Sequence, residues 1–172
     1  DSLSYMYPPA ILTGGEISHS INSLFLINDF NLSTSLQGNV SARVEQTSLN
    51  DHWQILPRAS LTYKMKDFYL SAIAGLYQQL PENSFLLRNQ HLSAERCWQY
   101  ILGAYHEANG KTFRLEVYNK KYHNLAINLN NNYKSDGYGY ARGIDLFLND
   151  REVVKNLEYM LAYSYNDSKR KY

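Results

Sequence analysis

The chain has 172 residues, a net charge of +1 and a pI of about 8. This length suits one domain or one large part of a domain. The balanced charge, with no basic stripe interleaved with aromatic residues, argues against nucleic acid as a partner. Sixteen tyrosines and two tryptophans suit a boundary between water and an apolar phase, although a tyrosine-rich soluble β-protein would have a similar composition.

No group of residues predicts catalysis or a cofactor, so we expect the protein not to be an enzyme. The single cysteine, Cys97, excludes a disulfide within the chain and is interpreted as a packed thiol. The five histidines are scattered without the spacing of a metal site. Paired carboxylates for glycoside hydrolysis remain an open alternative, but charges on a strand face are the simpler interpretation.

Residues 1–20 contain two prolines and two glycines, which predicts an irregular lead-in. After it, eight runs have the two-residue alternation of strands, and no stretch has helical periodicity. A polar, basic tail is predicted for Asn166–Tyr172. The predicted strands are Ile21–Asn28, Ser33–Gln46, Leu56–Lys66, Phe68–Gln79, Cys97–His106, Thr112–Tyr122, Tyr138–Leu148 and Leu157–Tyr165.

The clearest strand, Thr112–Tyr122, has one apolar face and one charged face. Phe113 and Val117 lie on one parity, whereas Arg114 and Glu116 lie on the other. Successive side chains of a strand point to opposite faces, so this strand separates two environments. Most of the other predicted strands repeat the pattern.

The predicted connections alternate between short and long. In an up-and-down meander, alternate connections lie at opposite ends, so this pattern is typical of outer-membrane barrels with short periplasmic turns and longer external loops. The last connection, Asn149–Asn156, is intermediate. The short connections are Asp29–Leu32, Lys66–Asp67 and Glu107–Lys111, and the long ones are Thr47–Gln54, Leu80–Arg96 and His123–Gly137.

Two interpretations of the apolar parity remain. It faces lipid around a wet interior, or it packs the core of a soluble, lipocalin-like binding barrel. Strands of about ten residues favour lipid, because a tilted strand of that length crosses the hydrocarbon layer. Aromatic residues near the predicted strand ends resemble two interfacial girdles: Phe68, Phe113 and Phe147 by the short turns, and Tyr77, Tyr122 and Tyr165 by the long loops.

An ordered set of short segments resembles the TonB-dependent outer-membrane receptors. The set runs from about Ser20 to Tyr172. Its members are Pro57–Lys64, Gly75–Pro81, Leu92–Arg96, Glu116–Tyr122, Gly139–Phe147 and Leu161–Tyr165, followed by Ser168–Arg170.

The resemblance implies an all-β, antiparallel meander of about eight strands over residues 21–172, which forms part of a transmembrane β-barrel in the bacterial outer membrane. It also implies import of a bulky, scarce nutrient of the siderophore, cobalamin or oligosaccharide class. The implied partners are outer-membrane lipid, the rest of the receptor with its plug, and a TonB-type energy-coupling protein. We expect neither plug nor coupling segment within these residues. A self-contained eight-stranded barrel, serving as an anchor or adhesin, is the alternative.

Ligand contacts are expected at the long-loop end, because amide and aromatic side chains there suit a polar solute. A solvated surface loop is the competing interpretation for each residue. The candidates are Arg88, Gln90 and His91 in one loop and Asn130, Asn131 and Tyr133 in the other.

Overall fold

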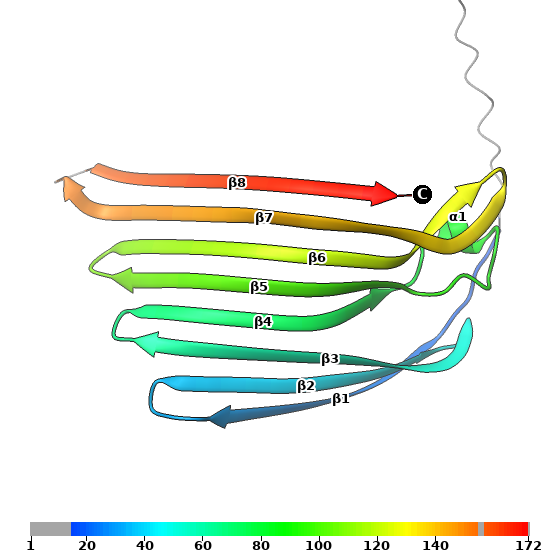
Figure 1. Cartoon of the computed structure of the whole chain (residues 1–172), viewed down its shortest axis with the longest axis horizontal. Coiled ribbons are helices and arrows are strands. Elements are labelled where there is room, and N and C mark those ends of the chain that lie inside the picture. Colours follow the sequence, from blue (N-terminus) through cyan, green and yellow to red (C-terminus); the bar gives the residue numbers. More distant parts are fainter. Residues whose placement is uncertain (1–14, 155–156, 172) are drawn as a thin grey trace, which may run out of the picture.

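The structure is a computed structural model that describes residues 15–154 and 157–171, apart from the side chains of residues 50–52, 151–154 and 157. One antiparallel sheet contains nearly all of these residues (Figure 1). A four-residue helix lies between β4 and β5. The elements are β1 (Ile21–Asn31), β2 (Leu36–Thr47), β3 (Asn50–Met65), β4 (Phe68–Gln79), α1 (Asn83–Leu86), β5 (Glu95–Ala108), β6 (Lys111–Leu129), β7 (Asn132–Val154) and β8 (Leu157–Lys171).

The strands pair in sequence order from β1 to β8, each antiparallel to the next. The all-β, up-and-down meander of eight strands is therefore confirmed. The connections β1–β2, β3–β4, β5–β6 and β7–β8 lie at one end, here called the turn end (Figure 1). The connections β2–β3, β4–β5 and β6–β7 lie at the other end, here called the loop end.

Several predicted loops at the loop end are wrong, because the strands continue through them. β2 ends at Thr47 and β3 begins at Asn50, so the expected long connection Thr47–Gln54 shrinks to a tight turn. β6 and β7 run on through the asparagine-rich segment His123–Gly137, and β8 includes most of the expected tail. Most residues of β3, β7 and β8 are polar in these segments, and in β6 the apolar residues Leu125 to Ile127 are consecutive and lie at register shifts. The alternation of one apolar face is therefore lost, whereas backbone pairing needs no apolar face.

The predicted Leu80–Arg96 connection is mostly correct and contains α1. Glu95 and Arg96, at the end of this expected connection, instead begin β5. Residues 15–20 precede β1 without strand structure, and residues 1–14 of the expected lead-in lie outside the described part. β7 continues to Val154, so the expected Asn149–Asn156 connection is wrong over residues 149–154, and residues 155–156 lie outside the described part.

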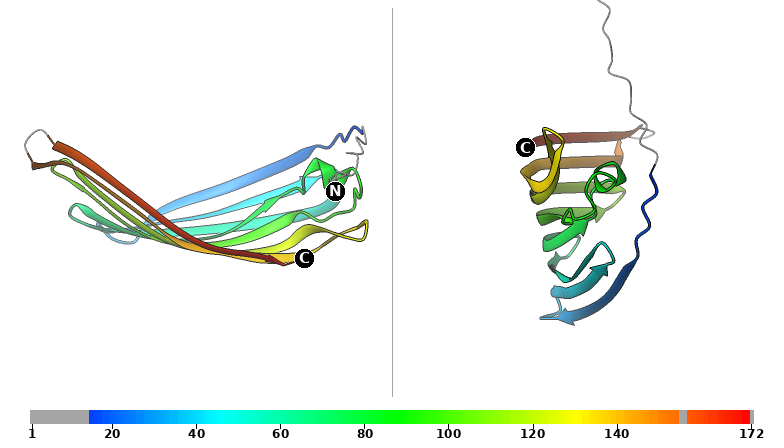
Figure 2. Two further views of the ribbon diagram at one scale, coloured as in Figure 1. Left: turned by 90° about the horizontal axis from the view of Figure 1, so that it is seen from above. Right: turned by 90° about the vertical axis from the view of Figure 1, so that its right-hand side faces the viewer.

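The sheet does not close on itself. β1 pairs with β2 alone and β8 with β7 alone, so both outer strands are free edges (Figure 1). The alternatives that require a closed small barrel, an eight-stranded anchor or a lipocalin-like binder, therefore do not match this structure. The sheet is instead a curved segment of wall (Figure 2).

Buried apolar packing is concentrated at the loop end. Leu86, Leu92 and Ala126 form a cluster there, whereas Leu24, Leu26 and other large apolar side chains of the strands are more than half exposed. Among the described residues, no helix is long and apolar enough to cross a membrane.

Candidate functional site

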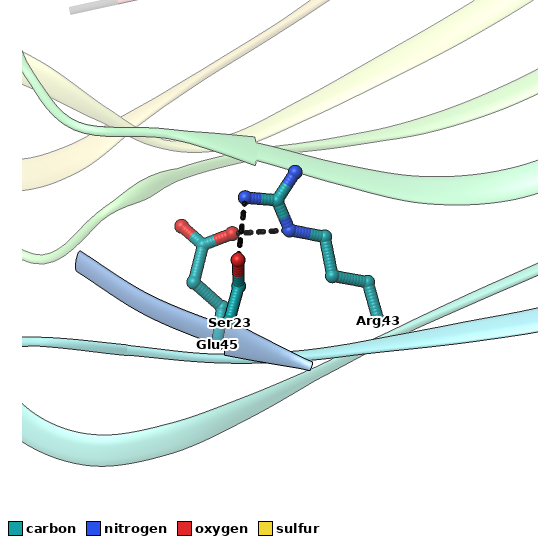
Figure 3. Close-up of polar contacts among 3 residues, drawn as sticks. All are labelled: Ser23, Arg43 and Glu45. Carbon is teal, nitrogen blue, oxygen red and sulfur yellow. Dashed lines mark hydrogen bonds and ion pairs between the residues drawn. The ribbon is translucent and has the colours of Figure 1, made fainter. Parts of the chain in front are cut away.

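The concave side of a barrel wall is the interior, and the strand parity that carries most charges is assigned to it. On β2, Arg43 Nε lies 2.8 Å from Glu45 Oε2, and Arg43 also donates a hydrogen bond of 3.3 Å to Ser23 Oγ on β1 (Figure 3). Ion pairing between partly exposed charges contributes little stability but is compatible with a wet surface. This face is therefore suited to contact with water or a polar solute.

Aromatic rings on the same face lie against the cations. The Arg58 guanidinium is 4.2 Å from the centre of the Tyr77 ring, and that of Arg114 is 5.7 Å from the centre of the Tyr105 ring. Stacking of this kind holds long side chains against the wall. The interior face is thus a polar and aromatic surface without an apolar core.

At the loop end, the β4–β5 connection packs on the β6–β7 hairpin and forms a compact unit, here called the loop cap (residues 80–94 and 125–137). The Phe85 and Tyr133 rings meet edge to face, with centroids 5.8 Å apart. Asn89 Nδ2 donates to the Tyr133 carbonyl oxygen at 2.9 Å, and the Ser93 N–H donates to Ser135 Oγ at 2.9 Å. The two loops proposed from sequence are therefore brought together.

The tip of the β6–β7 hairpin is formed by Asn130 and Asn131, whose φ angles are 54° and 63°. Two successive left-handed residues make a type I′ turn, and asparagine is one of the few side chains that tolerate this backbone. Leu129 and Asn132 pair across the turn. The turn geometry thus accounts for this asparagine pair.

The six candidate contact residues therefore occupy different situations. Tyr133 is half-buried and holds the loop cap together through its ring and its carbonyl group. Arg88, Gln90 and His91 are exposed on the β4–β5 connection, and the asparagine pair is exposed at the hairpin tip. Tyr133 and the β4–β5 loop are joined in one unit, but no contact joins the six residues into a single pocket. Among the described residues, no group of three or more His, Cys, Asp or Glu side chains could hold a metal ion.

Sequence analysis missed a polar recess on the interior face next to the loop cap. Its volume is about 390 Å³, and it lies over β4 to β8. Gln79 Nε2 donates to Glu95 Oε2 at 2.9 Å, while Glu95 Oε1 accepts from the Ala126 N–H at 3.0 Å. Arg170 donates to the Ala126 carbonyl oxygen at 2.7 Å, and Tyr122 lies between these groups in the lining.

The sequence would have indicated the recess if the two-residue alternation of each strand had been continued into the polar residues at the strand ends. Gln79 and Glu95 pair in register at the end of β4 and the start of β5, on the parity of Tyr77 and Gln99. Arg170 continues the interior parity of β8 in a segment that the sequence suggested was a tail. The recess offers carboxylate, amide, phenol and guanidinium groups to a polar ligand.

The opposite parity forms an apolar band whose position shifts from strand to strand. On β3 the band extends from Ile55 to Met65, and on β8 it extends from Tyr159 to Tyr165. Tyr165 is level in register with Leu61, through Ile144, Val117, Leu102 and Ala72. The edge of the band nearest the loop end is here called its upper edge. On β8 this upper edge thus lies in the same register row as the middle of the band on β3.

This shift measures the tilt of the strands to a flat apolar layer. From β8 to β3, the edge of the band shifts along the strands by the six residues from Leu61 to Ile55, at about 3.3 Å per residue. The distance across the strands is five spacings of about 4.8 Å. The ratio of these two lengths corresponds to a strand tilt of about 40°. With that tilt, the ten residues between Ile55 and Met65 span about 25 Å of height, the height of the apolar band on outer-membrane barrels. The band therefore has the geometry of a lipid-facing belt.

Half of the predicted aromatic girdle is wrong. Phe68, Phe113 and Tyr165 lie on the apolar parity, as expected, but the other three lie on the interior parity. The error arose because strand ends were considered without parity. The three interior residues are Tyr77, Tyr122 and Phe147, and the outward aromatic residues that were missed include Trp98, Tyr100, Tyr159 and Tyr163.

A family model described as "TonB dependent receptor-like, beta-barrel" matches residues 2–172. The chain belongs to this family. It is therefore part of the barrel of an outer-membrane receptor, and its apolar band has the height expected of a lipid-facing surface. The long β4–β5 connection and the protruding β6–β7 hairpin lie at the loop end, so we assign this end to the outer side of the membrane and the turn end to the periplasm, because external loops of such barrels are the longer ones.

The solved structures that this receptor barrel resembles show the same fold at low sequence identity. The siderophore receptor PirA from Pseudomonas aeruginosa matches with a TM-score of 0.76 at 16% identity, over 87% of this chain and 32% of that one. The FrpB iron transporter from Neisseria meningitidis matches with 0.71 at 11%, over 88% and 26%. The alcaligin outer-membrane receptor FauA from Bordetella pertussis matches with 0.66 at 17%, over 88% and 30%.

The chain spans about a third or less of the length of these structures. It matches none of the curated proteins with which it was compared. The wall segment is thus established, whereas what its two faces contact and the cargo are matters for proposal.

Proposed function

We propose that this chain is part of the barrel of a TonB-dependent receptor that imports a bulky, scarce nutrient of the siderophore, cobalamin or oligosaccharide class. The observation that carries the proposal is the family match over residues 2–172. The division of the sheet into a lipid-facing band and a polar interior supports it. A transporter of this kind needs a wide interior, which an open wall segment with two free edges supplies once further strands pair with β1 and β8.

The proposed partners are those of the whole receptor. A plug fills the interior, a TonB-type protein supplies energy from the inner membrane, and further strands pair with both edges. Residues 21–171 contribute wall only, so we assign the plug and the coupling segment to other parts of the receptor. Three of the similar structures are a siderophore receptor, an iron transporter and an alcaligin receptor, which makes a ferric chelate the first cargo to test.

We propose that the cargo contacts the interior recess and the loop cap. Tyr122 and Arg170 line the recess, and Arg88 and His91 are exposed on the cap above β4 and β5. An anionic chelate is attracted by the guanidinium groups, whereas a sugar stacks on phenol rings and binds amides. The two cargo classes therefore depend on different residues.

Uptake by cells that carry the complete receptor tests this function. Radiolabelled ferric siderophores, cobalamin and oligosaccharides are supplied to wild-type cells, to cells without the receptor and to cells without the TonB-type protein. We expect uptake of one class to be lost in both deletion strains. Receptor-dependent uptake that persists without the TonB-type protein, or no receptor-dependent uptake of any class, contradicts the proposal.

Variants of the recess then assign the cargo contact. Tyr122→Phe keeps the ring and removes the hydroxyl group, whereas Tyr122→Ala removes both. A stacked cargo loses binding only with alanine, but a cargo hydrogen-bonded to the phenol loses it with both variants. Lys66→Gln at the turn end is the control and leaves uptake unchanged.

A further inference from the structure

The lipid-facing side contains a trough that crosses four strands. Its volume is about 470 Å³, and its lining comes from β3, β4, β5 and β6. One wall is the register row that includes Ala59, Ala74 and Asn119, and the other is the row that includes Leu61 and Val117. The intervening residues point inward, so their backbone forms the floor. Small side chains on β3 and β4 thus leave a continuous apolar hollow.

The trough ascends through the membrane because the strands are tilted. At β3 it lies near the middle of the apolar band, which extends from Ile55 to Met65. At β6 it lies at the upper edge, because Val117 is the last apolar outward residue and Asn119 follows it. From β3 to β6 the trough is about 14 Å long, or three strand spacings. It therefore leads from the bilayer interior to the outer interface.

Basic residues gather on the outward parity where the trough ends. Lys121 is the outward residue beyond Asn119 on β6, and Arg142 on β7 pairs in register with Asn119. Lys169 on β8 lies in the same register row as Lys121, and Tyr140 on β7 lies between them. Among the described residues, Lys121 and Lys169 form no ion pair, and both are exposed.

One carboxylate lies within this basic cluster, and it is already neutralised. Asp167 Oδ2 is 2.8 Å from an Arg142 terminal nitrogen and 2.9 Å from Arg142 Nε. On β1, β2 and β4, the outward positions at the matching height are uncharged: Asn22, Gln46 and Gln78. Arg96 on β5 pairs in register with Gln78 and adds a further outward cation beside β6. The positive charge is thus gathered on β5 to β8, on and next to the strand at which the trough ends.

We propose that the trough and the basic cluster together bind one lipid of the outer leaflet. One acyl chain lies in the trough, and a phosphorylated head group lies against Asn119, Lys121 and Arg142. The apolar hollow suits the chain, and the cations suit the phosphate by charge complementarity. This site is on the outer side of the wall, so it does not depend on which cargo passes through the interior.

Lipid retention by the complete receptor, purified from outer membranes in mild detergent, tests the proposal. Native mass spectrometry follows binding of phosphatidylglycerol, and phosphatidylcholine with the same acyl chains serves as the uncharged comparison. We expect one phosphatidylglycerol to remain bound at concentrations where phosphatidylcholine is lost. Lys121→Gln is expected to weaken the phosphatidylglycerol affinity about fivefold, since each cation near an anionic head group contributes by about that factor.

Two further variants separate the head-group contact from the trough. The neutral pair Arg142→Gln/Asp167→Asn removes the guanidinium without leaving its carboxylate unpaired, and we expect weaker phosphatidylglycerol binding. Ala74→Phe fills the trough and is expected to weaken both lipids. Matched controls are Lys66→Gln at the turn end and Ala42→Phe on the outward parity of β2, and heat-modifiable gel migration verifies folding of each variant.

Equal retention of the two lipids overturns the charge contact, and unchanged binding with Ala74→Phe overturns the trough. Displacement of the lipid by millimolar inorganic phosphate would show that the cations bind phosphate alone, which also contradicts the proposal. Loss of lipid binding with either control variant would mean that binding is not specific to the trough and the basic cluster, which would also contradict the proposal.

Discussion

Two glycines, Gly143 on β7 and Gly38 on β2, show how single residues permit close contact between paired strands. Gly143 on β7 pairs with Tyr118 on β6, and a Cβ atom at Gly143 would meet the Tyr118 hydroxyl group and the Tyr165 carbonyl oxygen well inside contact distance. Gly38 has the same relation to Phe30, its partner on β1. An aromatic ring that covers a cross-strand glycine stabilises a sheet with strong curvature.

Gly143→Ala is therefore expected to destabilise the barrel by about 1 to 3 kcal/mol, the usual range for overpacking. The backbone carbonyl of Tyr165 is part of the clash, so Tyr118→Ala does not restore stability. Urea unfolding in lipid vesicles, followed by heat-modifiable gel migration, measures the effect. Ala141→Ser adds one atom on the same face of the same strand and is the control. Equal stability of Gly143→Ala and wild type would refute the steric argument.

The asparagine pair at positions 130 and 131 shows that a residue type can be misinterpreted when its backbone conformation is unknown. The pair suggested a ligand contact because amides bind polar solutes, but the backbone at both positions is left-handed. Neighbouring asparagines between two strands are also a hairpin signal. That signal was overlooked because the asparagine-rich segment was interpreted as a polar loop, although Leu125, Ile127 and Leu129 alternate in it.

At the scale of elements, strand parity was predictable wherever one face is apolar. Phe68–Gln79 was predicted with its observed bounds, and all eight strands were found. The predicted bounds of β6, β7 and β8 were wrong at the loop end, because β7 and β8 are largely polar on both faces there and β6 has register shifts around Leu125. The recess depends on pairing between strand ends, which requires the register as well as the pattern.

Among the described residues, the cluster of buried apolar side chains lies in the loop cap. Leu86 is fully buried in it, and Leu92 and Ala126 pack beside it. Because α1 has only four residues, its stability comes from this packing and from the hydrogen bonds of Asn89 and Ser93. The loop cap is thus an ordered unit at the loop end of the sheet.

Leu86→Ala is expected to cost the cap about 2 to 5 kcal/mol of local stability, as for other buried leucines. Hydrogen exchange of residues 83–94 and 125–135 should accelerate, while exchange in β3 and β4 stays unchanged. Leu32→Ala, at an exposed position on the turn end, is the control. Global loss of protection would mean that the cap is integral to the whole sheet, contrary to this account.

At the scale of the whole molecule, one relation accounts for the shift of the apolar band and the position of the trough: the strands are tilted by about 40° to a flat apolar layer. The sequence predicted a lipid-facing parity, but it could not predict the shift of the band, because the shift is visible only when residues are compared across paired strands. Leu61, Val117 and Tyr165 are level in register yet occupy the middle, the upper edge and the upper edge of the band on their own strands.

Depth measurement by spin labels tests this relation most directly. Single labels replace Leu61, Val117 and Tyr165 in the complete receptor in lipid bilayers, with Cys97→Ala removing the native thiol. The ratio of oxygen to nickel-chelate accessibility reports depth. We expect the deepest label at Leu61 and shallow labels at Val117 and Tyr165, with the neighbouring interior position Thr62 accessible to the nickel chelate. Equal depths at the three positions, or a label at Thr62 that lies deeper in lipid than the one at Leu61, would contradict the account.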